Sequence, residues 1–466
     1  MAHEETAGAR EAALAEKADA MCRMGSMMLA AGTGSYRVKA AMGRVAQALG
    51  IEQLEAQVSL NEIVATTRSR GTFRTEVVEV PTPVVNADRI GSLMRLSLRA
   101  RDGMTAAELQ TRLDRIGRRH ALYSRPSIAA AAAMACAAFA FLNNGRWQEC
   151  LAAGLAAALG KAVQLALHRA RLNQLAVVAG ASAAACTLYM LLAFALQFVL
   201  PVGGEPLHQA AFTSAILFLV PGFPLMTAAL DLARFDFTSG VSRLAYAAMI
   251  TMATALGAWV VALWFGLSPL ATPPLQLPLW AVVGARALAS FFGVLGFAIT
   301  FNTPLRVAVV ASTIGTLANL ARLAAVDLGW NALLCALGAT TIVGLLAAFA
   351  ARHIVTPRVT LSVPAVLIMI PGASAFRALV ALINNDPMAA VLNGTTSLFV
   401  VISLAAGLVV ARMLTDQAWI EANPHWTAMP HTRAQTVLLR QERAAEREAE
   451  RAVERAIARD VDPDAG

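Results

Sequence analysis

Two stretches of this chain have matching sequences, AILFLVPGFPLMTAALDLARFD at residues 215–236 and AVLIMIPGASAFRALVALINND at residues 365–386. At a fixed offset of 150 residues, Pro221-Gly222 aligns with Pro371-Gly372, and Asp236 aligns with Asp386. Apolar matches are weak evidence in a chain rich in Leu and Ala, but a Pro-Gly pair inside an apolar run, followed by an acid at the same distance, is less easily produced by chance. The pattern predicts a duplicated membrane unit with one broken helix in each half.

The charges separate the chain into a membrane region and two polar ends. Of its 466 residues, 57% are hydrophobic and 15% are charged, and residues 127–411 carry 12 Lys/Arg and 6 Asp/Glu. An ordinary soluble chain is about 25% charged. The pI near 9.8 does not indicate nucleic-acid binding, because much of the excess Arg lies beside apolar runs, where basic residues anchor cytoplasmic loops. The N-terminus lacks the apolar core of a signal peptide, so we expect it to stay in the cytoplasm.

Apolar runs of about 20 residues, the length of a membrane-spanning helix, recur from Ser127 onward. We predict ten spans, at 127–144, 147–167, 172–200, 209–230, 241–266, 278–300, 304–326, 330–351, 359–383 and 390–411. Five spans per repeat place the second copy upside down relative to the first, as in many secondary transporters. The fold class is therefore a mainly α membrane protein of ten helices in two inverted five-helix repeats.

We expect four regions: a cytoplasmic α/β domain at 1–126, membrane repeats at 127–266 and 278–411, and a charged cytoplasmic helical tail at 412–466. The first region reads as α-α-β-β(-β)-α-α, with Gly32 and Gly50 as helix stops and Thr105 as an N-cap three residues before Glu108. Arginines concentrate on one set of short loops, which places both termini in the cytoplasm by the positive-inside rule.

The prolines of the two broken helices remove backbone donors, so the carbonyls of Leu217 and Leu367 lose their usual partners. In lipid such carbonyls must find another partner or face a water-filled cavity. Gly222 and Gly372 let a ligand or a second helix approach. A packing kink explains either pair alone, whereas the matched positions favour a binding site.

Charged and polar residues at membrane depth are the other site candidates. An arginine can bind a carboxylate, and an acid can pair with an ammonium group or carry a proton. For Asp231, Arg234, Asp236 and Arg243 the alternative is an ion-pair cluster at the inner face, and for Arg286 and Arg377 it is a structural tie to neighbouring carbonyls. Polar residues on the path could equally join helices. The candidate substrate-binding or coupling residues are Pro221, Gly222, Asp231, Arg234, Asp236, Gly240, Arg243, Arg286, Asn302, Pro371, Gly372, Ser374 and Arg377.

The sequence offers no enzyme motif. It contains no H-x-x-x-H, no Cys/His cluster with zinc spacing and no G-x-x-x-x-G-K-S/T, so we expect no catalytic residues, metal or cofactor. Two rival interpretations remain. One is a membrane-anchored enzyme with its chemistry in the N-terminal domain, and the other is a scaffold that binds partners through the charged tail.

Together these features resemble the threonine/serine exporter (ThrE) family, including its two-subunit relatives of the YjjP/YjjB type. The resemblance lies in MCRMGSMMLAAGTGSYRVKAAMGRVAQALG near the N-terminus, VPGFPLMTAALDLARFDFTSGVSRLAYA in the first half and IPGASAFRALVALINNDP in the second. By these motifs Pro221, Gly222, Asp231, Gly240, Arg243, Pro371 and Gly372 match the family. The opening segment reads GTGSYRV where the family tends to have an acid.

The resemblance implies proton-driven export of small hydroxy amino acids, threonine or serine, across the bacterial inner membrane. Some relatives are linked to dicarboxylate export instead. The expected partners are a small amino-acid substrate, protons and the lipid bilayer, without nucleic acid, and a homo-oligomer is compatible with this interpretation. Within the split relatives the two halves are separate subunits, and the corresponding seam here is 267–277.

Overall fold

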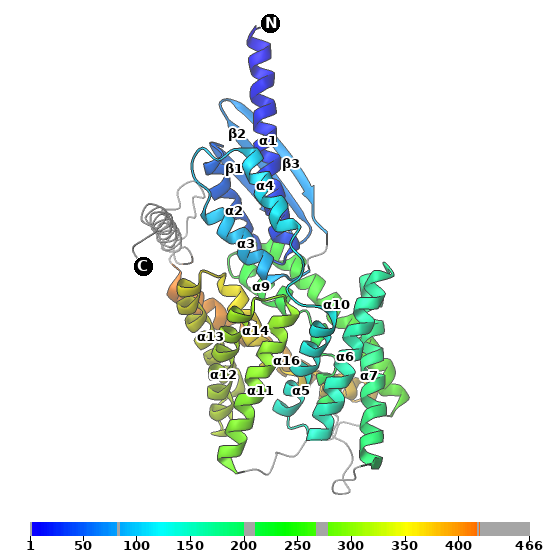
Figure 1. Cartoon of the computed structure of the whole chain (residues 1–466). Helices are drawn as coiled ribbons and strands as arrows, with labels where there is room; N and C mark the ends of the chain where they lie inside the picture. Colours follow the sequence, from blue (N-terminus) through cyan, green and yellow to red (C-terminus); the bar gives the residue numbers. More distant parts are fainter. Residues whose placement is uncertain (1, 82–83, 200–209, 267–277, 417–418, 420–466) are drawn as a thin grey trace, which may run out of the picture.

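The structure is a computed structural model that describes residues 2–81, 84–199, 210–266, 278–416 and 419 (Figure 1). The predicted tail at 412–466 lies outside the described residues except for 412–416 and 419, and the seam at 267–277 lies outside them entirely. The described part is mainly helical, with one small sheet near the N-terminus.

The N-terminal part of the chain folds into an α/β unit, hereafter the N-terminal unit. Its elements are α1 (Ala2–Ala30), α2 (Ser35–Ala48), β1 (Gln53–Val58), β2 (Glu62–Ser69), β3 (Thr72–Glu79), α3 (Ala87–Leu98) and α4 (Ala106–Gly117). This is the predicted order, and the third strand is present. The strands form an antiparallel sheet in the order β1-β2-β3, with Ala65 of β2 between Ala56 of β1 and Glu76 of β3.

Local sequence explains where these elements end. Gly32 and Gly50, which follow α1 and α2, have φ values of +94° and +72°, which a glycine adopts without steric cost. The Thr105 hydroxyl accepts a hydrogen bond from the Glu108 amide at 3.2 Å and so caps α4. Helix α1 packs across β2 and β3 and contacts α2 and α4 on its other sides. The core of the unit is apolar and includes Met21, Met24, Leu29, Val38, Met42, Ile63, Leu93, Leu109 and Leu113.

Eight of the described helices are long and apolar enough to cross a membrane. They are α5 (Arg125–Leu142), α6 (Trp147–Arg169), α7 (Gln174–Val199), α10 (Phe237–Trp264), α11 (Leu279–Thr300), α12 (Leu305–Asp327), α13 (Ala332–Ile354) and α16 (Pro387–Thr415). Large apolar side chains such as Met252 and Leu256 on α10 are exposed, which suits a helix surface in contact with lipid tails rather than with water.

The predicted fourth and ninth spans are not single helices. The fourth consists of α8 (Ala210–Ser214), a 3₁₀ turn η1 (Leu217–Leu219) and α9 (Gly222–Leu232), and the ninth consists of α14 (Arg358–Leu367) and α15 (Gly372–Ile383). The described residues therefore contain eight long apolar helices and two interrupted segments, which lie at the two spans where a broken helix is predicted. Both segments are divided at the Pro-Gly pair, where proline cannot continue the helical hydrogen-bond ladder.

The two halves have the same order of elements: three long helices, an interrupted segment and a final long helix. Contacts between the halves are reciprocal. In the first half, α9 contacts α14 and α16 of the second half. In the second half, α15, which corresponds to α9, contacts α8 and α10, which correspond to α14 and α16. The first helices of the halves, α5 and α11, also pack against each other.

Helices α5 and α11 run in opposite directions. The Leu122 amide, just before α5, donates to Asn302 Oδ1 at 2.8 Å, and the Tyr123 hydroxyl donates to the Thr303 carbonyl at 2.8 Å, just after α11. The start of α5 therefore lies beside the end of α11. Small residues line this contact: a Cβ at Gly296 would lie 2.4 Å from the Ala131 carbonyl oxygen, which is the close backbone approach that small residues permit in membranes.

The N-terminal unit lies against one end of the helices (Figure 1), and it is hydrogen-bonded to the residues just after α11. The amides of Ala87 and Asp88, at the start of α3, donate to the carbonyls of Phe301 and Asn302 at 2.9 and 3.2 Å. The Asn302 side-chain amide also donates to Asn86 Oδ1 at 3.0 Å. These bonds fix α3 directly over the end of α11.

Candidate functional site

The two Pro-Gly breaks have nearly the same backbone geometry. Pro221 has φ −79° and ψ 56°, and Pro371 has φ −79° and ψ 64°. The Gly222 amide donates to the Val220 carbonyl at 2.8 Å, and the Gly372 amide donates to the Ile370 carbonyl at 2.8 Å. The likeness seen in the two sequences is thus also a likeness of local structure.

The carbonyls next to the breaks are not left without donors. Leu217 accepts from the Val220 amide at 3.1 Å, and Leu367 accepts from the Ile370 amide at 3.2 Å. Of the two possibilities for these carbonyls, the structure shows the first, another donor, because the chain tightens into a 3₁₀-type turn before each break.

The breaks pack against opposite halves of the protein. A Cβ built on Gly222 would lie 1.9 Å from Leu367 Cδ2, and one built on Gly372 would lie 2.7 Å from Phe139 Cε1. Neither glycine therefore tolerates a side chain without movement of its neighbours. Lys161 of α6 lies nearby, with its Nζ 5.8 Å from the centre of the Phe218 ring in η1.

A buried ion pair joins the end of α9 to the start of α10. Arg243 Nε lies 3.2 Å from Asp231 Oδ2, and the two side chains are 1% and 3% exposed. The Ser239 hydroxyl donates to the same Asp231 oxygen at 2.9 Å, and Arg243 Nε lies 3.1 Å from the Ser239 hydroxyl. A buried pair needs such additional hydrogen bonds to offset the loss of hydration.

The loop between α1 and α2 completes this cluster from the N-terminal unit. The Ser35 amide donates to Asp231 Oδ2 at 3.3 Å, and Arg243 Nη2 donates to the Thr33 carbonyl at 2.8 Å. Asp231 thus lies at the N-terminus of α2, where free amides favour a negative charge. Gly34 makes the approach close, since a Cβ there would lie 3.2 Å from Asp231 Oδ1.

Asp236 forms a second contact between the same parts. Its Oδ2 accepts from Lys39 Nζ at 2.7 Å and from the Ser35 hydroxyl at 2.8 Å. Both members of the Lys39–Asp236 pair are largely buried. Asp236 also caps α10 through the Ser239 amide, at 3.5 Å.

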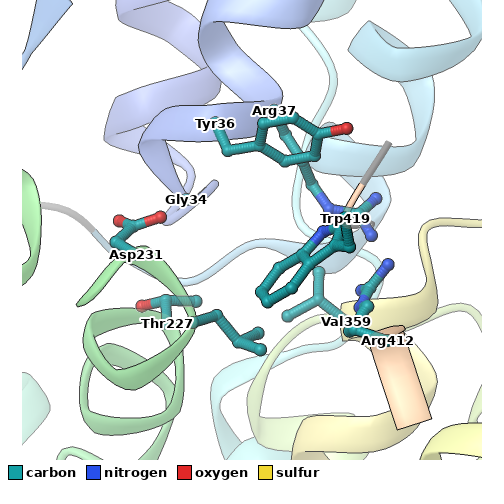
Figure 2. Close-up of a pocket in the computed structure, with 9 residues that line it drawn as sticks. Gly34, Tyr36, Arg37, Thr227, Asp231, Val359, Arg412 and Trp419 are labelled. Carbon is teal, nitrogen blue, oxygen red and sulfur yellow. The ribbon is translucent and has the colours of Figure 1, made fainter. Parts of the chain in front are cut away.

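A small pocket lies beside this cluster (Figure 2). It is lined by Gly34, Tyr36, Arg37, Thr227, Leu230, Asp231, Val359, Arg412 and Trp419. Four parts of the chain meet here, since the residues come from α2, α9, α14 and the end of α16. Its volume of about 30 Å³ gives room for about two water molecules.

Arginine is prominent around the pocket. Arg412 is only 8% exposed, and its Nη1 lies 3.8 Å from Asp416 Oδ2. Arg37 lines the same pocket, and Arg358 bonds the Thr415 hydroxyl nearby at 2.8 Å. Burial lowers the pKa of Arg37, and the neighbouring charge of Arg358 lowers it further. Three arginines thus lie in or near the pocket with two acids, Asp231 and Asp416, of which Asp231 is already paired with Arg243. This balance of charge favours an anion.

Arg234 stacks on two aromatic residues of the pocket lining. Its guanidinium carbon lies 3.7 Å from the centre of the Tyr36 ring and 5.3 Å from that of Trp419. Both contacts are of the cation–π type.

The structure brings together only part of the predicted site. Asp231, Arg234, Asp236 and Arg243 lie in one cluster, and Gly240 packs against Leu232 beside it. Pro221, Gly222, Pro371 and Gly372 form the two breaks. The remaining predicted residues have other partners.

Arg286 pairs with Asp327 at the end of α12, at the opposite end of α11 from Asn302. Arg377 is exposed and donates to Asn393 Oδ1 at 3.1 Å. The Ser374 hydroxyl donates to the Pro371 carbonyl at 3.2 Å and so stays at the second break. Asn302 joins α11 to α3 and to the start of α5.

Sequence reasoning did not select several residues that complete the cluster and pocket. They are Thr33, Gly34, Ser35, Arg37, Lys39, Thr227, Ser239, Arg358 and Arg412. One signal was present in the sequence: GTGS, two glycines with two small hydroxyl residues, is suited to close contact with another backbone or with a carboxylate.

Comparison with known proteins finds two family models that match the chain. A family model described as "Putative threonine/serine exporter" matches residues 19–265, and one described as "Threonine/Serine exporter, ThrE" matches residues 286–414. No solved structure matches the chain.

Two curated relatives are named "Probable succinate transporter subunit YjjP". The protein from Klebsiella aerogenes is 26% identical over 242 residues, which are 52% of this chain and 90% of the relative. The protein from Escherichia coli K12 is 27% identical over 234 residues, which are 50% and 88%. The resemblance inferred from the motifs is confirmed, and the chain belongs to the threonine/serine exporter family.

Proposed function

We propose that this protein exports small hydroxy amino acids, threonine or serine, and that proton movement drives the export. The substrate is held where the two interrupted segments meet. The observation that carries this proposal is the pair of equivalent breaks at Pro221 and Pro371, each packed closely against the other half of the protein. Paired broken helices of this kind form the binding sites of many secondary transporters.

We infer an inverted repeat, in which the interrupted segments also cross the bilayer and the halves are related by a two-fold axis in the membrane plane. The reciprocal contacts of α9 and α15 support this relation, and so does the antiparallel packing of α5 and α11. In this arrangement the N-terminal unit covers the cytoplasmic side of an inner membrane, and both termini lie in the cytoplasm. One chain then contains the two parts that are separate subunits in the split relatives. Labelling of single cysteines by an impermeant reagent in intact cells tests the orientation: labelling near Trp330 and not near Arg358 is expected.

The N-terminal unit acts in this proposal as a gate. The pocket beside Asp231 is too small for threonine or succinate. The GTGS loop, residues 32–35 between α1 and α2, covers it on the side of the N-terminal unit. Movement of this loop would uncover Asp231, which could then take up a proton or pair with the ammonium group of the substrate.

Transport itself is tested in proteoliposomes preloaded with labelled threonine. We expect efflux that depends on the protein and that changes when a pH gradient is imposed. Efflux equal to that of empty liposomes, with and without the gradient, would contradict the proposal. Activity of residues 1–126 expressed alone, as in the enzyme interpretation, would contradict it as well.

A dicarboxylate is the second candidate substrate. Two arginines that line the pocket, Arg37 and Arg412, favour it, because each could bind one carboxylate. The curated relatives also carry succinate in their names. Labelled succinate in the same liposomes separates the two candidates, because the preferred substrate will inhibit efflux of the other at lower concentration.

In this proposal the substrate passes the opened Asp231 pocket on its way to the breaks. Arg412→Gln, which removes a cation from the pocket lining, is therefore expected to raise the KM of transport by about tenfold or more, whichever carboxylate is the substrate. A charge-assisted hydrogen bond contributes roughly 1.5–3 kcal/mol, and about 1.4 kcal/mol corresponds to a tenfold change in affinity. The matched control is Arg352→Gln, which removes an exposed arginine of α13 that does not line the pocket. Equal KM values for the two variants would remove Arg412 from the substrate path.

A further inference from the structure

A second site lies in the N-terminal unit, away from the breaks and the Asp231 cluster. It is a groove between α3 and α4 with a volume of about 390 Å³, which falls in the range of small-molecule sites, roughly 300–1,000 Å³. The groove, hereafter the arginine groove, is lined by Ser92, Arg95, Leu96, Arg99, Arg112, Arg115, Ile116 and Arg119.

Helical spacing places these arginines on facing sides of the groove. Arg112, Arg115 and Arg119 follow one another at intervals of three and four residues along and just beyond α4, and Arg95 and Arg99 are four residues apart at the end of α3. Residues at such spacing share one face of a helix. Helices α3 and α4 pack against each other, so five guanidinium groups border one space.

Two of these guanidinium groups converge on one neutral atom. Arg95 Nη2 donates to the Ser92 hydroxyl at 3.2 Å, and Arg119 Nη1 donates to the same oxygen at 3.1 Å. Burial lowers the pKa of Arg95, Asp88 opposes this effect, and Arg119 and Arg99 lower the pKa further. An anion between Arg95 and Arg119 would relieve the repulsion between them.

Within the described residues, the acids pair with only part of the groove. Glu108 pairs with Arg112 at 2.6 Å, and no described acid forms an ion pair with Arg95, Arg115 or Arg119. Asp114 is on the same helix but pairs with Arg23 of α1, on another face. The excess of positive charge therefore belongs to the groove itself.

We propose that the arginine groove binds a phosphate-bearing anion. Guanidinium groups match phosphate oxygens with paired hydrogen bonds, and several arginines around one space suit a ligand with more than one phosphate or with a phosphate and further acceptors. This chemistry is shared by soluble polyphosphate compounds and by the headgroups of anionic phospholipids. A soluble ligand can reach the groove, because Arg99, Arg115 and Arg119 are exposed. A lipid headgroup can reach it as well, because Arg119 is three residues from Leu122, which bonds Asn302 at the end of α11.

The test uses the full-length protein purified in detergent and measures pyrophosphate binding by calorimetry. Arg95→Gln together with Arg119→Gln should weaken binding by about tenfold or more, the effect of losing charge-assisted hydrogen bonds. The control, Arg10→Gln with Arg118→Gln, removes the same charge from exposed positions outside the groove and should change binding less than about twofold.

A second arm identifies the source of the phosphate. Protein reconstituted in nanodiscs of phosphatidylglycerol and phosphatidylcholine is released and weighed by native mass spectrometry. Selective retention of phosphatidylglycerol, lost in the Arg95/Arg119 variant and kept in the control, assigns the groove to lipid headgroups, whereas pyrophosphate binding without lipid retention assigns it to a soluble ligand. If neither probe distinguishes the variant from the control, the proposal is overturned.

Should the first variant unfold, Arg99→Gln with Arg115→Gln serves the same test, because these two side chains are exposed at the rim of the groove.

Discussion

Asp231→Asn is expected to abolish transport and to lower the free energy of unfolding by about 3–5 kcal/mol. The substitution keeps the size of the side chain but leaves the guanidinium of Arg243, which is 1% exposed, without its counter-charge. It also weakens the hold of α9 on the Ser35 amide at the start of α2. Thermal unfolding in detergent and efflux from proteoliposomes measure the two effects.

Asp386→Asn is the matched control for Asp231→Asn. Asp386 is exposed and caps α16 by accepting from the Ala389 amide at 3.0 Å, a role that asparagine fills equally well. Its stability and transport should therefore equal those of the parent protein.

A double-mutant cycle separates loss of the ion pair from loss of packing. Asp231→Asn combined with Arg243→Met removes both charges, so the combined loss of stability should be smaller than the sum of the single losses by about 0.5–3 kcal/mol. Additive losses, or a stable and fully active Asp231→Asn protein, would show that the pair is not essential.

Gly296→Ala is expected to destabilise the protein by about 1–3 kcal/mol, a typical effect of overpacking. Its new Cβ would lie 2.4 Å from the Ala131 carbonyl oxygen and 2.9 Å from the Ala135 amide nitrogen. These are backbone atoms of α5, so no side-chain rotation can relieve the contact, and the two halves must move apart where their first helices meet. The midpoint of thermal unfolding in detergent is the measurement.

Gly284→Ala is the control for this substitution. Gly284 lies on the same helix, and a Cβ there would meet nothing within 4 Å. Both substitutions improve helix propensity by about 1 kcal/mol, so the difference between them reports the α5–α11 contact alone. Equal stability of the two variants would contradict the close packing of these helices.

Sequence patterns predicted the parts of this structure that depend on neighbouring residues. The Pro-Gly pairs at Pro221 and Pro371 end one helix and begin another because proline cannot donate the required hydrogen bond. Thr105 and the glycines after α1 and α2 mark helix ends for equally local reasons. These signals are contained in stretches of a few residues, so they can be read without the fold.

The partners of the charged residues could not be predicted in this way. Asp231 was selected as a candidate, but Ser35, which donates to it, is 196 residues away in the chain. Arg286 was selected for its depth in a predicted span, yet it pairs with Asp327, which is 41 residues away at the end of the next helix. Such pairings depend on which helices pack together, and an apolar pattern gives the existence of a helix but not its neighbours.

The N-terminal unit is fastened to both halves of the helical region, and this has a mechanical consequence. Its attachment to the residues just after α11 includes uncharged hydrogen bonds through Asn86, Ala87 and Asp88. Its attachment to α9 and α10 includes the charged contacts of Lys39 and of Asp231. If the two halves rotate against each other during transport, one of these attachments must break. The uncharged hydrogen bonds next to α11 are weaker than the charged contacts to α9 and α10. We then expect the N-terminal unit to move together with the first half as a rigid body. A cross-link between residues 87 and 301 would prevent this movement and stop transport.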